Sequence, residues 1–163
     1  MIIEEFKGDY DFLSNFYPSL VSYGDVVYKT LEHAYQAQKS FDRIYRLQIQ
    51  QCKTPGQAKR LGKTAILRRN WRDIKYVIMW ELVRKKFINN PVLRQKLLDT
   101  GDAVLEEGNT WGDKYWGRDL RTGEGENKLG QILMLVREEI KRGGLPLIGK
   151  GVGLNPTAVK GLR

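Results

Sequence analysis

The chain has 163 residues, enough for one domain that buries about two-thirds of the surface its unfolded chain would expose. It has one cysteine and one histidine, which excludes a disulfide framework and a clustered zinc site, so we expect neither a metal nor a cofactor. A net charge of +9 favours phosphate-bearing partners, and the short apolar runs predict a cytoplasmic protein with no membrane partner.

The first part of the chain is predicted to hold short strands followed by a helix. The apolar opening at positions 2–6 favours one strand. Positions 20–28 favour a hairpin, with Gly24-Asp25 as its two-residue turn. Thr30 is a typical helix N-cap, and the helix that it starts is predicted to run from position 31 to about 41.

Three more helices are predicted before position 102. Thr54 and Pro55 open a helix that Gly62 closes. The segment 73–88 has an apolar face at helical spacing and stops at an Asn-Asn-Pro sequence. The next helix starts there and ends at Gly101. The apolar face of the 73–88 helix consists of Ile74, Val77, Ile78, Leu82 and Val83.

The last third is predicted to contain a short strand at 103–107, a glycine-rich loop at 108–126 and a final helix capped by Asn127. These elements predict an α+β fold: one predominantly α-helical domain with a small antiparallel β component. We expect the domain to span residues 1–144, and 145–163 to form a basic, glycine-rich C-terminal tail.

Positive charge is concentrated in two segments. Between Lys53 and Lys75 there are eight basic residues and one acidic residue, Asp73. After Glu139 there are five more basic residues and no acidic one. Each segment is either a solvated face that aids solubility or a surface that meets phosphates, and both interpretations stay open.

One face of the helix predicted after Thr30 carries four functional groups. Glu32, Tyr35, Gln36 and Lys39 are spaced i, i+3, i+4 and i+7, which places them on one stripe. Ala34, Ala37 and Phe41 take the opposite side. An acid, a phenol, an amide and an amine suit a polyhydroxylated ligand, although an acid and an amine on one face are also typical of a surface ion pair.

Two loops and a helix start supply further candidates. Asp113 lies among tryptophans and glycines, a combination that can bind ribose hydroxyls and stack on a base, although the tryptophans can instead belong to the core. Asn15 can contact a ligand and Phe16 can stack on it. At Asn127 the helix start also offers backbone N–H groups to a phosphate. His33 projects away from the stripe, which is typical of a packing residue.

Six motifs occur in order along the chain: Phe12 to Ser19, Tyr28 to Lys39, Met79 with Lys86-Phe87, Leu97 to Asp102, Asp113 to Gly117, and Gly125 to Gly130. Together they resemble the NADAR, or YbiA-like, family of N-glycosidases. The resemblance implies a YbiA-like fold and hydrolysis of N-glycosidic bonds, in ribosylamino intermediates of riboflavin synthesis or in ADP-ribose attached to guanine bases. The tail after Gly144 has no counterpart that we can place in the family pattern.

Within this resemblance, residue roles follow from the chemistry of a ribose C1′–N bond. Glu32 can protonate the leaving nitrogen or, when ionised, activate water. The resemblance implies that Lys39 attacks C1′ and forms a Schiff base, but an ionised Glu32 would keep the lysine protonated, so Lys39 is either nucleophile or electrostatic binder. We predict Glu32, Lys39 and Asp113 as catalytic, and Asn15, Phe16, Tyr35, Gln36, Trp116, Gly117 and Asn127 as substrate-binding.

Three functions are consistent with these residues. The first is a metabolic N-glycosidase that acts on a phosphorylated ribosyl small molecule. The second is a glycosidase that removes ADP-ribose from nucleic acid, which the basic segments favour. The third is a non-catalytic module that binds ADP-ribose or nucleic acid, for which the combination of Glu32, Tyr35 and Lys39 would be unnecessary.

Overall fold

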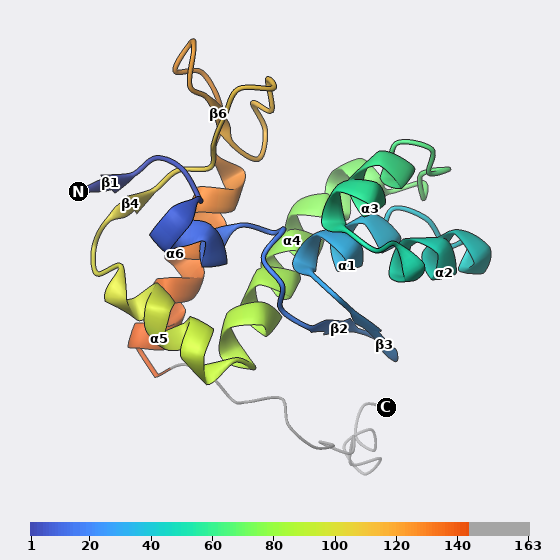
Figure 1. Cartoon of the computed structure of the whole chain (residues 1–163), viewed down its shortest axis with the longest axis horizontal. Coiled ribbons are helices and arrows are strands. Elements are labelled where there is room, and N and C mark those ends of the chain that lie inside the picture. Colours follow the sequence, from blue (N-terminus) through green and yellow to red (C-terminus); the bar gives the residue numbers. More distant parts are fainter. Residues whose placement is uncertain (144–163) are drawn as a thin grey trace, which may run out of the picture.

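The computed structural model describes residues 1–143, so the predicted tail at 145–163 lies outside the described residues. No helix within these residues is both long enough and apolar enough to cross a membrane. Helices dominate the arrangement (Figure 1). The elements are β1 (Ile2–Ile3), the 3-10 helix η1 (Gly8–Leu13), β2 (Val21–Tyr23), β3 (Val26–Tyr28), α1 (Leu31–Ala37), α2 (Arg43–Gln51), α3 (Pro55–Gly62), α4 (Trp71–Ile88), α5 (Pro91–Asp99), β4 (Val104–Leu105), β5 (Gly108–Asn109), β6 (Arg118–Asp119) and α6 (Lys128–Lys141).

Helix α4 is the centre of the fold. It packs against α1 on one side and against α5 and α6 on the other, and α2 and α3 cover α1 from outside (Figure 1). Leu82 and Phe87 of α4 are fully buried. The loop that carries β5 and β6 projects from one end of the molecule (Figure 1). This packing leaves α1 enclosed by other helices, although four of its seven residues are polar.

The strands form three separate pairs. The predicted hairpin is confirmed, since β2 and β3 pair antiparallel around Gly24 and Asp25. The other two pairs, β1 with β4 and β5 with β6, are parallel, so the predicted antiparallel β component is correct only for the hairpin. The strands β1 and β4 are about a hundred residues apart in the sequence. No local sequence pattern predicts that two such distant segments pair in parallel.

Local capping signals predicted several helix ends correctly. Thr54 forms a capping box with Gln57, and α3 ends at Gly62 as expected. The side chain of Asn90 caps α5 through the Leu93 amide (3.1 Å). Helix α4 begins at Trp71, two residues earlier than predicted, and Val77 of its predicted apolar face is exposed.

The main helical differences lie between positions 38 and 52. Helix α1 ends at Ala37, so Lys39 lies in the following turn and Phe41 is an exposed residue rather than part of a packed face. Helix α2 was not predicted. Its sequence signals are Asp42, which accepts hydrogen bonds from the first amides, and the buried pair Tyr45 and Ile49 one turn apart.

Asn127 is the N-cap residue of α6, as predicted, but its side chain does not cap the helix. It has a left-handed backbone (φ 50°), which asparagine tolerates, and its side chain makes no cap hydrogen bond. Instead its Oδ1 accepts from the Glu107 amide (3.0 Å) and its Nδ2 donates to the Leu105 carbonyl (2.9 Å). The amides of Lys128 and Leu129 donate to loop carbonyls, so they are not free to bind a phosphate.

Replacing Asn127 with alanine is expected to lower the free energy of unfolding by about 2 to 6 kcal/mol. The substitution leaves two buried backbone groups without partners, at about 1 to 3 kcal/mol each. Urea denaturation measures the effect. Asn70→Ala is the matched control, because Asn70 also precedes a helix but makes no side-chain cap bond and is exposed. Equal effects of the two substitutions would contradict a special role for Asn127.

Candidate active site

A cavity of about 280 Å³ opens where α1, α3, the loop after η1 and the loop between β5 and β6 meet. It brings together eight of the ten predicted site residues, from segments up to a hundred positions apart. They are Asn15, Phe16, Glu32, Tyr35, Gln36, Lys39, Asp113 and Trp116. Gly117 and Asn127 do not line it.

Glu32 is held in the wall of the cavity by its helix. Its amide donates to the Asn15 carbonyl (3.0 Å), which ties the loop after η1 to α1. Its carboxylate accepts a hydrogen bond from Gln36 (2.7 Å). Burial raises the pKa of Glu32, while the bond from Gln36 and the charge of Lys59 lower it in part. A buried carboxyl with one donor can therefore exchange a proton with a bound ligand.

Lys39 reaches the same cavity from the turn after α1. Its Nζ lies 3.4 Å from the Gly62 carbonyl at the end of α3. Burial lowers the pKa of Lys39, and the nearby Glu32 opposes that change without reversing it. The sequence raises the difficulty that an ionised Glu32 would keep the lysine protonated. In the structure, desolvation lowers the pKa of Lys39 by more than the charge of Glu32 raises it, so this difficulty is reduced.

His33 points away from this chemistry. Its ring is fully buried, with Nδ1 2.8 Å from the Thr30 hydroxyl and Nε2 3.1 Å from the Cys52 carbonyl. Because a carbonyl can only accept, Nε2 carries the proton and Nδ1 accepts from Thr30. Burial lowers the pKa of His33, so the ring is a neutral packing residue, as the sequence indicated.

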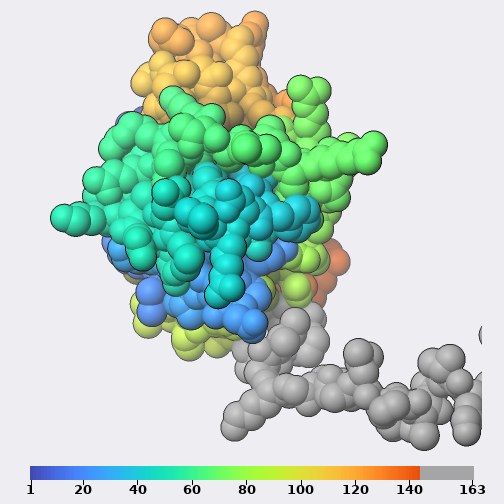
Figure 2. Space-filling model, turned by 90° about the vertical axis from the view of Figure 1, so that its right-hand side faces the viewer, coloured from blue at the N-terminus to red at the C-terminus, as the bar shows by residue number. Residues whose placement is uncertain are grey.

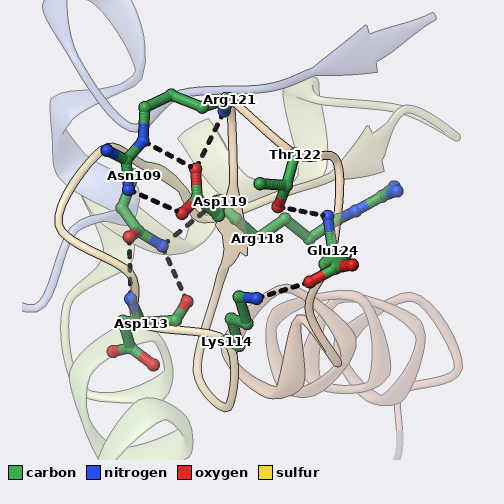
Figure 3. Close-up of polar contacts among 8 residues, drawn as sticks. All are labelled: Asn109, Asp113, Lys114, Arg118, Asp119, Arg121, Thr122 and Glu124. Carbon is green, nitrogen blue, oxygen red and sulfur yellow. Dashed lines mark hydrogen bonds and ion pairs between the residues drawn. The ribbon is translucent and has the colours of Figure 1, made fainter.

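The loop that carries Asp113 is braced by a polar network (Figure 3). Asn109 donates to the Asp113 carbonyl (2.8 Å) and accepts from the Asp113 amide (2.9 Å). In Figure 3 the carboxylate of Asp113 points away from Asn109. Its Oδ1 accepts from the amides of Tyr115 and Trp116, so this carboxylate both shapes the turn and reaches the cavity wall.

Aromatic rings form one side of the cavity. Trp116 meets Tyr35 edge to face, with ring centroids 5.6 Å apart. Burial raises the pKa of the Tyr35 phenol, which therefore acts as a neutral hydrogen-bonding group. Trp111 is 61% exposed, so the core interpretation of this residue is wrong. These rings offer faces and edges against which a base can stack.

Lys59 of α3 lies between two exposed rings at the cavity. Its Nζ is 5.7 Å from the centroid of Phe16 and 5.3 Å from that of Trp111. Within residues 1–143 this lysine makes no ion pair with a carboxylate. A cation held by ring faces keeps its charge available for an anionic ligand.

The sequence did not single out several residues that line the cavity. Lys59 appeared only as part of a basic segment, and Glu107 was not considered. Ser14, Met79, Trp111 and Leu129, which were not among the predicted site residues either, complete the set. Gly117 has a packing role instead, since a Cβ at this position would collide with the Glu107 carbonyl.

Part of the basic segment 53–75 lies beside the cavity, with Lys59 in its wall. Figure 2 shows a face covered by α2, α3 and the residues that follow α3, with the loop around β6 rising above it. The amide of Arg68 donates to the Lys39 carbonyl (2.8 Å), which places this segment against the end of α1. Exposed positive charge therefore lies near the cavity.

The chain resembles known proteins over most of its length. The NADAR domain family profile matches residues 3–141. N-glycosidase YbiA of Escherichia coli is 39% identical over 134 residues, which cover 81% of this chain and 82% of that protein. An N-glycosidase of Nostoc punctiforme is 42% identical, over 81% of this chain and 86% of its own length.

A longer relative and a solved structure add to this similarity. A riboflavin biosynthesis protein of Vibrio vulnificus is 38% identical over 82% of this chain, and the matched part spans 36% of that protein. The solution structure of Escherichia coli YbiA has a TM-score of 0.78 at 34% identity, over 88% of this chain and 86% of that one. This likeness confirms the predicted YbiA-like α+β fold.

Proposed function

Since this chain belongs to the NADAR domain family and is an N-glycosidase, we propose that its substrate is a ribosyl phosphate joined to an amino nitrogen of a pyrimidine. The name of the riboflavin biosynthesis relative from Vibrio vulnificus supports an aminopyrimidine leaving group. The single observation that carries the proposal is the convergence of a buried acid, a partly buried amine and a tryptophan on one sugar-sized cavity.

The chemistry follows from what a breaking C1′–N bond requires. The electron pair leaves on nitrogen, which must gain a proton, and C1′ must gain an oxygen from water. Glu32 provides acid–base chemistry, and Lys39, whose pKa burial lowers, provides an amine that can bond to C1′. Asp113 has one oxygen, Oδ2, left for a ribose hydroxyl. We expect Trp116 and Phe16, which both line the cavity, to pack on the base.

The test compares two substrates. The protein is incubated with a ribosylaminouracil phosphate and with an oligonucleotide carrying ADP-ribose on guanine, and the released base is measured. We expect turnover of the first. Failure to release a base from any ribosyl substrate, together with ligand binding that Glu32→Gln leaves unchanged, would support a non-catalytic binding module instead.

Lys59 is proposed to bind the phosphate. Replacing it with methionine keeps the apolar stem against Phe16 and Trp111 and removes the charge. We expect KM for the phosphorylated substrate to rise about tenfold or more, since a hydrogen bond to a charged group contributes about 1.5 to 3 kcal/mol. Steady-state kinetics on the ribosylamine with and without its phosphate measure the effect.

Two comparisons make the Lys59 prediction specific. The same substitution is expected to leave KM for the dephosphorylated ribosylamine nearly unchanged. Lys63→Met is the matched control, because Lys63 belongs to the same basic segment but is exposed and does not line the cavity. Equal losses on both substrates would show that Lys59 acts on cavity shape and not on the phosphate.

A second candidate substrate is ADP-ribose attached to guanine in DNA. The observation that favours it is the exposed basic segment beside the cavity, because phosphate neutralisation supplies most nonspecific affinity for nucleic acid. Activity on modified DNA that falls steeply with salt, beside weak activity on the small ribosylamine, would favour this candidate. Salt-tolerant turnover of the small substrate favours the first.

A further inference from the structure

Glu107 is a cavity residue whose backbone is fixed from three directions. It lies between β4 and β5, and its amide donates to the buried side chain of Asn127 (3.0 Å). Its carbonyl accepts from the Arg118 amide of β6 (3.0 Å). Gly117 lets that segment come close enough, since any side chain there would strike the Glu107 carbonyl. Two predicted site residues that do not line the cavity, Asn127 and Gly117, therefore position one that does.

The Glu107 side chain differs from that of its neighbour. Glu106 forms an ion pair with Arg118 (2.7 Å). Glu107 lines the cavity, and its Oε2 is buried with no hydrogen-bond partner in the part of the chain that the structure describes. A buried carboxylate oxygen without a donor is unfavourable when ionised, which favours the protonated acid with its hydrogen available to a ligand.

Charged groups from four segments face Glu107. Asp113 of the loop and Glu32 of α1 raise its pKa, and Lys59 of α3 and Lys86 of α4 lower it. Lys86 is itself buried and donates to the Ser14 carbonyl (2.7 Å). Burial has the largest effect, and together these groups raise the pKa of Glu107 to about 7. Glu107 can thus hold its proton at neutral pH.

Glu32 differs from Glu107 in its hydrogen bonding, because its carboxylate has a donor. The amide of Gln36 donates to its carboxylate, which stabilises the ionised form and lowers the pKa of Glu32 in part, although burial raises that pKa overall. Two carboxyls in one cavity with different environments are a common arrangement for one acid and one base. Burial raises the pKa of both carboxyls, so the hydrogen bonding distinguishes them. Glu32 accepts a donor and the Oε2 of Glu107 has none, which favours the proton on Glu107 and the charge on Glu32.

Resting on the proposed N-glycosidase function, we propose that Glu107 is a second catalytic carboxyl, which gives its proton to the leaving nitrogen while Glu32 acts as the base. When the C1′–N bond breaks, its electron pair stays on nitrogen and takes the Glu107 proton. A water molecule adds to C1′, directly or after Lys39 has held the sugar, and its proton passes to Glu32. Proton exchange with solvent restores both carboxyls, so the net reaction consumes one water.

Glu107→Gln tests this role with Glu106→Gln as the adjacent control. On the ribosylaminouracil phosphate we expect the Glu107 variant to lose about 100-fold or more in kcat/KM, and the Glu106 variant to stay within about threefold of wild type. Wild-type kcat/KM is expected to fall above about pH 7, as Glu107 loses its proton. The residual activity of Glu107→Gln should lack this fall.

Three results would overturn the assignment. They are kcat/KM of Glu107→Gln within about threefold of wild type, a decline above neutral pH that persists in that variant, and a wild-type profile with no such decline. The wild-type pH profile needs no variant, so it tests the assignment even if Glu107→Gln folds poorly. The urea midpoint of the variant reports whether it is folded. Absence of wild-type turnover on every ribosyl substrate would remove the proposed function itself, a different outcome from these.

Discussion

Glu32→Gln is expected to lower kcat by about two to four powers of ten while the protein stays folded. Glutamine keeps the shape of the side chain, and its carbonyl oxygen can still accept the hydrogen bond from Gln36. It cannot exchange a proton with the substrate or with water. Single-turnover measurement of base release from the ribosylaminouracil phosphate reports the effect. Glu124→Gln is the control, because Glu124 is exposed and lies outside the cavity.

The same substitution is expected to stabilise the protein at neutral pH. Because burial raises the pKa of Glu32, the native state binds more protons than the unfolded state between the ordinary pKa and the raised one. Wild-type stability is therefore lost as pH rises through that window, and the variant does not lose it. Urea unfolding at acidic and at neutral pH measures this. The free energy of unfolding of the variant, relative to that of wild type, should increase as the pH rises. A variant that is both inactive and less stable would indicate a structural role for Glu32.

Signals within a few residues predicted most of the fold. Thr54 and Asn90 cap helices because each side chain bonds an amide three positions away, and such spacing is visible in a sequence. Asn127 carried the same signal but bonds residues 20 and 22 positions earlier. An asparagine whose side chain caps a helix and a left-handed asparagine that bonds distant residues give the same signal in a sequence. Only the tertiary partners distinguish them.

The candidate site was predicted to a similar extent and for a similar reason. The stripe on α1 and the Asp113–Trp116 loop consist of close neighbours, so periodicity and motif could find them. Glu107 could not be found, because its position in the cavity wall depends on hydrogen bonds of its backbone with Asn127 and Arg118, which are 20 and 11 positions away. From the sequence, Lys59 is recognisable only as one charge of the basic segment. Its position between two aromatic rings follows from the packing of α3 on α1, which the sequence does not show.

Lys39→Arg separates the two roles that the site allows for this residue. Arginine keeps the positive charge and can still donate to the Gly62 carbonyl, but it stays protonated and cannot bond to C1′. If Lys39 is the nucleophile, the variant should lose about three or more powers of ten in kcat, and a binding residue would lose far less. Lys59→Arg, a change in the second cavity lysine, is the matched control.

Borohydride trapping identifies the bond that kinetics can only imply. A Schiff base between Lys39 and C1′ is reduced to a stable amine, so wild-type protein should gain the mass of an open-chain ribosyl phosphate on the peptide that contains Lys39. The Lys39→Arg variant should gain none, and Lys59→Arg should keep the adduct. Turnover retained in Lys39→Arg, with no adduct in wild type, would leave Lys39 as an electrostatic group. Water would then attack C1′ directly, with Glu32 as its base.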